Sequence, residues 1–172
     1  TIRVPAALKP LVPTEAEQGP ILTEVEPNGY PLPSGYTGPD WQEIGEVETD
    51  GPAVTVKGTL DLDTDPRDRF IFHLTKPGSV SILLKHTCPA GVTNLFLAKG
   101  RDWPTNNEDE LVWAPIIGPN DDPDDQVVLS GVLPANEDYM VHLRYAVEGS
   151  CGYTVDISAQ GGSGSLQLSS TG

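Results

Sequence analysis

Two groups of acidic residues have a spacing that suits binding of a divalent cation. Glu24 and Glu26 lie two residues apart, so in an extended chain both carboxylates project to the same side, and Asn28 adds an amide oxygen there. The second group alternates in the same way and comprises Asp61, Asp63, Asp65 and then Asp68. Calcium takes about six to eight oxygen ligands from carboxylates, amides and backbone carbonyls, and it tolerates irregular geometry. Both groups are therefore candidate calcium ligands, with solvated loop acids as the alternative.

The second group does not form an EF-hand loop, although D-x-D-x-D is the way such a loop begins. The sixth position would be Pro66, where an EF-hand needs glycine, and the twelfth would be Phe72, where it needs glutamate. A third acidic run, residues 121–125, contains Pro123 and has no second segment to complete a site. We expect it to be a solvated surface turn.

The charge of the chain excludes several classes of partner. The 172 residues carry 25 Asp and Glu against 10 Lys and Arg, a net charge of −15. Nucleic acid and anionic membrane surfaces would repel such a protein. No apolar run approaches the roughly 18 residues of a membrane span. The sequence also lacks a P-loop, a G-x-G-x-x-G and a G-x-S-x-G motif, so we predict that it is not an enzyme.

Short alternating runs predict the elements that must position these residues. From about residue 54 the apolar residues recur with the period of half-buried strands, and turn signals such as Lys76-Pro77-Gly78 separate the runs. No segment has a helical stripe. We predict an all-β, antiparallel, jelly-roll-like β-sandwich of about eight strands. The expected strands are residues 54–62, 69–74, 79–87, 95–98, 111–114, 126–133, 139–145 and 152–157.

The two ends of the chain differ in composition from the predicted sandwich, residues 54–160. Residues 1–53 contain nine of the 17 prolines, which remove ladder donors, so we expect an extended segment that wraps over the folded body. Residues 161–172 begin as a Gly/Ser linker. The alternating run 166–170 then follows, which is either a tail or one further, detached strand.

The cysteines bear on the cellular compartment. Cys88 and Cys151 form no C-x-x-C motif, and each lies beside a predicted strand. We predict a disulfide, with two buried reduced thiols as the alternative. In the chain-entropy model, closing this loop would contribute about 4 kcal/mol. A disulfide favours a secreted or cell-surface protein. The three histidines, His73, His86 and His142, are expected at surface positions of the sheets.

Three sequence pieces form a recognisable set, namely E-V-E-P-N at residues 24–28, V-K-G-T-L at 56–60 and D-R-F-I-F at 68–72. Together they resemble the bacterial pre-peptidase C-terminal domain, a family that includes collagen-binding domains of clostridial collagenases. Looser matches follow at residues 94–97, 138–141 and 152–155, so that the resemblance covers residues 22–160. It implies a secreted β-sandwich with calcium between the N-terminal segment and the loop that joins the first two strands.

The resemblance also implies which residues hold calcium. Glu24, Glu26 and Asn28 match the first ligand group of the family, and Asp68 matches an acid of the second. Asp65 is a companion to Asp68. Two positions depart from the pattern, since Gly29 and Pro66 stand where many members have aspartate. Asp63 and Asp65 are expected to compensate.

These observations predict a non-catalytic binding or adhesion module, stabilised by calcium, whose partner is an extracellular polymer or protein. The alternative is a structural subunit of an extracellular filament or surface layer. In that case residues 1–11 or 166–170 would insert into the sheet of another copy of the chain.

Overall fold

The computed structural model describes residues 18–29, 32–88, 94–101, 110–114, 127–144 and 149–161. Residues 1–11, 121–125 and 166–170, on which predictions were made above, lie outside these ranges. The described ranges contain ten strands: β1 (Gln18–Thr23), β2 (Gln42–Val47), β3 (Ala53–Asp61), β4 (Arg67–Leu74), β5 (Gly78–His86), β6 (Asn94–Lys99), β7 (Glu110–Ala114), β8 (Val127–Leu133), β9 (Glu137–Arg144) and β10 (Ser150–Gln160). Within the same ranges, no helix has the length and apolar character needed to cross a membrane.

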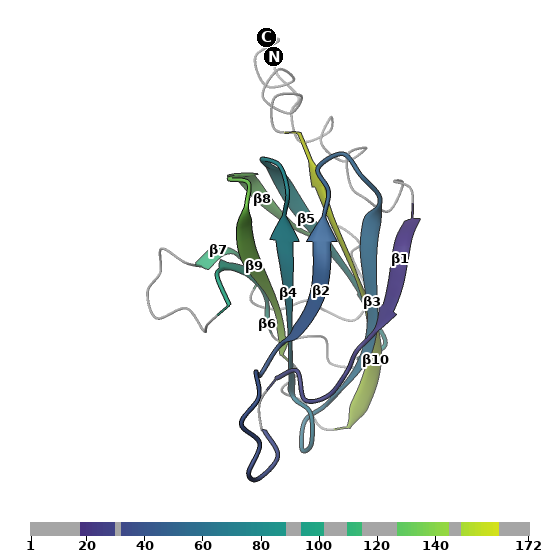
Figure 1. Ribbon diagram of the computed structural model, residues 1–172. Helices are drawn as coiled ribbons and strands as arrows, with labels where there is room; N and C mark the ends of the chain where they lie inside the picture. The colour runs from purple at the N-terminus through teal and green to yellow at the C-terminus, as the bar shows by residue number, and fades with distance from the viewer. Residues whose placement is uncertain are drawn as a thin grey trace.

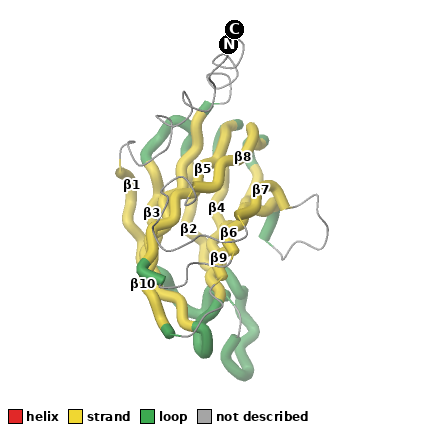
Figure 2. The backbone as a smooth tube through the Cα atoms, turned by 180° about the vertical axis from the view of Figure 1, so that it is seen from behind, coloured by secondary structure: helices red, strands yellow, loops and turns green. Residues whose placement is uncertain are grey.

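The strands form two five-stranded sheets, one behind the other in Figure 1 and seen from the opposite side in Figure 2. One sheet has the order β1-β3-β10-β5-β8 and the other β2-β4-β9-β6-β7. Each of the eight strands predicted from alternation is present, as β3 to β10. The prediction of an all-β sandwich is confirmed.

Two further strands, β1 and β2, lie in the Pro-rich segment that was expected to be extended and to wrap over the folded body. Each pairs in parallel with one strand, β1 with β3 and β2 with β4, so both sheets are mixed. Both strands are short and stand at sheet edges. The missing N–H donor of Pro20 in β1 is tolerated there, because an edge strand has a ladder on one side alone. Ile44 and Val47 of β2 enter the core, so this part of the segment is built into the fold.

The main core lies between the sheets. Alternate residues of β3, β4, β5, β9 and β10 point inward, and Phe70, Phe72, Leu84 and Val141 are among those with no exposed surface. Such regular alternation is what a strand with one buried face requires. The core therefore fixes the register of β3 and β4, and with it the turn between them.

A second, smaller apolar cluster lies on the other face of the β2-β4-β9-β6-β7 sheet and corrects the prediction for the histidines. It contains Ile71, Phe96, Ala98 and Met140. His142 stacks on Phe96 with ring centroids 4.6 Å apart and has no exposed surface. His86 is likewise buried, and of the three predicted surface histidines only His73 is partly exposed. Neighbouring strands bury both side chains, which a single-strand pattern does not reveal.

Candidate metal centre

Backbone pairing places residues 24–28 beside the turn between β3 and β4. The β1–β3 register sets Thr23 opposite Lys57, and the Glu24 N–H then donates to the Lys57 carbonyl at 2.8 Å. Four residues on, the Arg69 N–H donates to the Asn28 carbonyl at 2.7 Å. The segment is thus bonded to β3 at one end and to β4 at the other. Both the segment and the turn lie at the lower end of the sandwich in Figure 1.

The turn itself is shaped by Asp61. Its backbone exchanges two hydrogen bonds with Asp65, at 2.8 and 2.9 Å, and its carboxylate accepts the N–H groups of Asp63 and Thr64 at 3.0 Å each. The hydrogen bonds from Thr64 lower the pKa of Asp61. Asp61 therefore stabilises the reversal of the chain that brings Asp65 towards the segment 24–28.

Four of the six predicted ligands come together. Glu24, Glu26, Asp65 and Asp68 each offer one carboxylate oxygen, and these four atoms lie within 4.8 Å of one another. The predicted ligand Asn28 is fully buried, and its N–H donates to the Glu26 carboxylate at 3.1 Å. Asp63 is exposed on the turn and is not a member of this carboxylate group.

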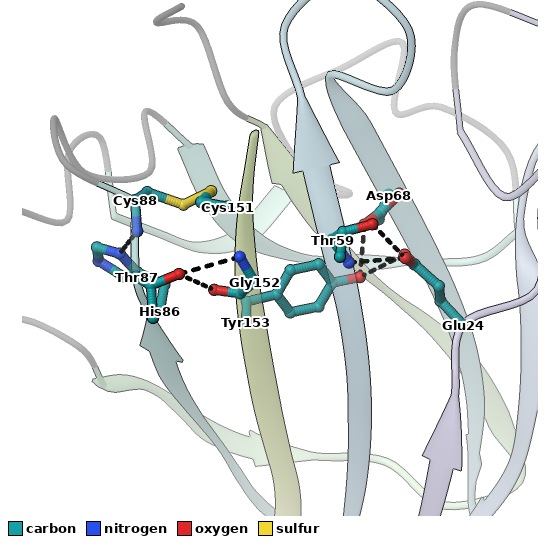
Figure 3. The surroundings of a disulfide bond; sticks show 9 residues. All are labelled: Glu24, Thr59, Asp68, His86, Thr87, Cys88, Cys151, Gly152 and Tyr153. Carbon is teal, nitrogen blue, oxygen red and sulfur yellow. Dashed lines mark hydrogen bonds between the residues drawn. A yellow bond between two sulfur atoms is a disulfide. The ribbon is translucent and has the colours of Figure 1, made fainter. Parts of the chain in front are cut away.

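A hydrogen-bond frame on β3 and β10 orients the carboxylates (Figure 3). One oxygen of Glu24 accepts the Thr59 N–H at 2.6 Å and the Thr59 hydroxyl at 3.0 Å. The Tyr153 hydroxyl lies 2.5 Å from Asp68 and 3.2 Å from the other oxygen of Glu24. Tyr153 was not predicted as a site residue. Nothing local marks it, because 85 residues separate it from Asp68 and 129 from Glu24.

Two glycines make room for this arrangement. A Cβ on Gly58 would lie 2.4 Å from both the Glu24 carboxylate and the Tyr153 hydroxyl. A Cβ on Gly29 would lie 1.6 Å from the Arg67 carbonyl oxygen. The close approach of Gly29 to β4 gives a physical reason for one departure from the family pattern, since an aspartate has no space there.

Burial and mutual repulsion shift the titration of the site. Burial first, and then the charges of Asp65 and Glu24, raise the pKa of Asp68 to about 10. Burial and the neighbouring Glu26 raise the pKa of Asp65 to about 8. Burial, followed by the charge of Asp68, raises the pKa of Tyr153. The ionised forms of these carboxyl groups are therefore unfavourable without a counter-charge.

Some buried polar atoms of the site have no hydrogen-bond partner, namely Oδ1 of Asp68 and both Oδ1 and Nδ2 of Asn28. Unsatisfied buried oxygen atoms are costly in a native fold. Clustered carboxylates with a free, buried oxygen fit the donor set of a hard cation such as calcium, which would supply the missing partner and the missing positive charge.

The predicted disulfide is confirmed and lies on the neighbouring strands. Cys88 follows β5 and is bonded to Cys151 at the start of β10, with the two Cα atoms 4.8 Å apart. Both residues are buried. The Cys88 N–H donates to Nδ1 of His86 at 3.1 Å (Figure 3).

Comparison with solved structures finds similar folds at low identity. The pre-peptidase C-terminal domain of collagenase from Bacillus anthracis matches with a TM-score of 0.49 and 15% identity, over 72% of this chain and 99% of that one. PliG from Aeromonas hydrophila, a periplasmic inhibitor of g-type lysozyme, matches with a TM-score of 0.38 and 18% identity, over 69% and 99%. PliG from Salmonella Typhimurium matches with a TM-score of 0.36 and 14% identity, over 67% of this chain and 98% of that one.

The family that the sequence resembles is thus found again among similar structures. No protein-family model matches the sequence, and no relative is found among curated proteins.

Proposed function

We propose that this chain is a non-catalytic binding module of a secreted or cell-surface protein, and that calcium joins its N-terminal segment to the β3–β4 turn. One observation carries the proposal: four carboxylates from two segments about forty residues apart come within 4.8 Å of one another, and one of them, Asp68, is buried and has an oxygen without a partner. Burial of the Asp68 carboxylate beside three further carboxylates is unfavourable unless a cation offsets the charge.

The ligands of the ion are supplied by residues already in place. Glu24, Glu26, Asp65 and Asp68 provide carboxylate oxygens, and the unpartnered amide of Asn28 is the fifth candidate side chain. The ion supplies positive charge, is coordinated by these oxygen atoms and takes part in no chemical step. Its effect is to fasten residues 24–28 to β4, because these residues are otherwise held by few backbone bonds.

The disulfide supports an extracytoplasmic setting, since disulfides persist mainly in oxidising compartments. Calcium is also plentiful enough there to occupy weak sites of extracellular modules. In this setting a small, rigid sandwich serves to bind an extracellular polymer or protein.

Calcium titration with stability measurement tests the proposal. We expect heat of binding for calcium and, at about 100 times the Kd, a stabilisation of about 2.7 kcal/mol. For a domain of this size, that corresponds to a rise in Tm of about 5–10 °C. A chelator should reverse the rise. Absence of both the heat and the shift would disprove the calcium site.

Matched variants locate the site. Glu26→Gln removes one charge from the carboxylate group and should weaken calcium binding, whereas Glu46→Gln on the edge strand β2 should leave it unchanged. Asp63→Asn decides whether the exposed turn residue also contributes. An equal response of Glu26→Gln and Glu46→Gln would contradict the assignment.

A further inference from the structure

The disulfide and the carboxylate group are linked by three residues of one strand. Cys151 and Tyr153 lie two apart on β10, so both side chains point to the same side, into the core. Cys151 lies opposite Leu60 of β3, and Tyr153 lies opposite Gly58, the glycine that makes room for the site. Figure 3 shows the disulfide at one end of this short stretch and the carboxylates at the other.

Tyr153 contacts the site through its hydroxyl alone. Its ring packs against Phe70 with centroids 6.5 Å apart, and its hydroxyl is the group that lies between Asp68 and Glu24. A Cβ on Gly58 would lie 2.4 Å from this hydroxyl, so the place of the hydroxyl depends on the absence of a side chain at residue 58. A shift of β10 at this point would therefore move the hydroxyl away from two candidate ligands at once.

The start of β10 is fastened to the end of β5 by the disulfide and by a small number of hydrogen bonds. Thr87 donates its N–H to the Gly152 carbonyl at 2.9 Å, and the Gly152 N–H donates to the Thr87 hydroxyl at 3.1 Å. These bonds are exposed and therefore weaker restraints than the buried disulfide. The disulfide therefore adds a covalent restraint, at the start of β10, to the ladders that this strand forms with β3 and β5 and from which Tyr153 reaches the site.

We infer that the Cys88–Cys151 disulfide and the cation site are energetically coupled through Tyr153. Reduction of the disulfide then weakens calcium binding, and bound calcium makes the disulfide harder to reduce. The inference rests on the proposed function. In the reduction, a dithiol reductant gives up two electrons: the protein S–S bond breaks, both cysteines become thiols, and the reductant closes to its own disulfide. Coupling between two equilibria is reciprocal, so the same factor must appear in both directions.

The coupling is measured as a ratio of calcium dissociation constants. We expect the folded double variant Cys88→Ala/Cys151→Ala to bind calcium about fivefold or more weakly than the oxidised wild type, at the lower end of the usual range for coupled sites. In a Tyr153→Phe background, removal of the disulfide should change the Kd by less than about twofold, because the hydroxyl that carries the effect is gone.

A second measurement needs no cysteine variant. Oxidised wild type is equilibrated in mixtures of reduced and oxidised dithiothreitol, with saturating calcium or with chelator at equal ionic strength, and the thiols are counted after quenching. Calcium should raise the ratio of reduced to oxidised dithiothreitol at which half of the protein is reduced, by the same factor of about five or more. Near-ultraviolet circular dichroism at half-reduction checks that the reduced protein stays folded.

The outcomes separate the two proposals. If oxidised wild type binds no calcium, both the proposed function and the coupling are disproved. If it binds calcium, three results would each overturn the inference alone. The first is an equal calcium Kd in the folded double variant and the wild type, and the second is a redox equilibrium that calcium leaves unchanged. The third is a Tyr153→Phe background in which removal of the disulfide changes the Kd by the same ratio as in the wild-type background.

Discussion

At the scale of single residues, Asp68 is the most informative side chain of the site. Its carboxyl is fully buried, one oxygen faces the Tyr153 hydroxyl, and the other has no partner. Burial raises its pKa to about 10, so in the absence of a cation the protonated form is preferred over most of the pH range. The residue that completes the candidate site thus destabilises the cation-free fold.

The variant Asp68→Asn tests this at the residue scale. Because the folded pKa lies above the ordinary value of 3.8, the stability that comes from this group is complete below about pH 4 and is lost as the pH rises towards 10. Asparagine stays neutral. In chelator we expect the variant to be more stable than wild type at pH 8, by about 1–3 kcal/mol, and equally stable at pH 4.

Urea unfolding between pH 4 and pH 9 measures this difference. In saturating calcium the order should reverse, since the variant lacks a charged ligand. A difference between the two proteins that does not change with pH in chelator would show that burial does not favour the protonated form of Asp68.

At the scale of elements, the edge strand β2 is held by side chains as well as by its ladder. The Arg101 guanidinium pairs with Glu43 of β2 and donates to Asp138 of β9 at 2.7 Å. It also lies 4.9 Å from the centroid of the Trp41 ring. Asp138 in turn contacts His73 at 2.9 Å, and both contacts lower its pKa. Because β2 has one neighbouring strand in its sheet, such contacts help to hold this edge strand in place.

Substitution of Arg101 tests the role of these contacts. Arg101→Met should lower the free energy of unfolding by about 0.5–1.5 kcal/mol, a modest loss because the ion pairs are partly exposed. Hydrogen exchange should accelerate most at the amides of β2. Lys99→Met is the matched control, since the ion pair of Lys99, at 3.9 Å, is with Glu137 of β9 and not with β2. Equal effects of the two variants would contradict this role.

At the scale of the whole molecule, stability comes from the packing of one sheet against the other. The core contains residues of both sheets, among them Val56, Leu84 and Val155 from one, and Phe72 and Leu143 from the other. The site depends on this packing, because Gly58 and Thr59 belong to the first sheet and Asp68 to the second.

A pair of leucines on the same sheet tests where the stability lies. Leu84 has no exposed surface, so Leu84→Ala should cost about 2–5 kcal/mol, with a matching fall in Tm of about 2–4 °C per kcal/mol. Leu129 on the edge strand β8 is 48% exposed, and Leu129→Ala should change stability by about 0.5 kcal/mol or less. Similar losses in thermal unfolding of both variants would contradict a core confined to the interior of the sandwich.

The sequence by itself determined the features that depend on local pattern. Alternation of apolar residues predicted β3 to β10, because this period is typical of a strand with one buried face. The E-x-E-P-N motif, together with Asp65 before β4 and Asp68 at its start, predicted four acids that the structure brings together. The presence of two cysteines and no third predicted which residues form the disulfide.

The tertiary structure alone decided the features that depend on contacts between distant segments. The parallel pairing of β1 and β2 depends on strands that lie later in the chain, so neither run shows it locally. Asp63 is exposed while Asp65 joins the carboxylate group, because the turn built on Asp61 directs them differently. Gly58 meets Glu24 because β1 pairs with β3, and Tyr153 reaches both because β10 pairs with β3. Contacts between strands so far apart in sequence leave no mark on any one of them.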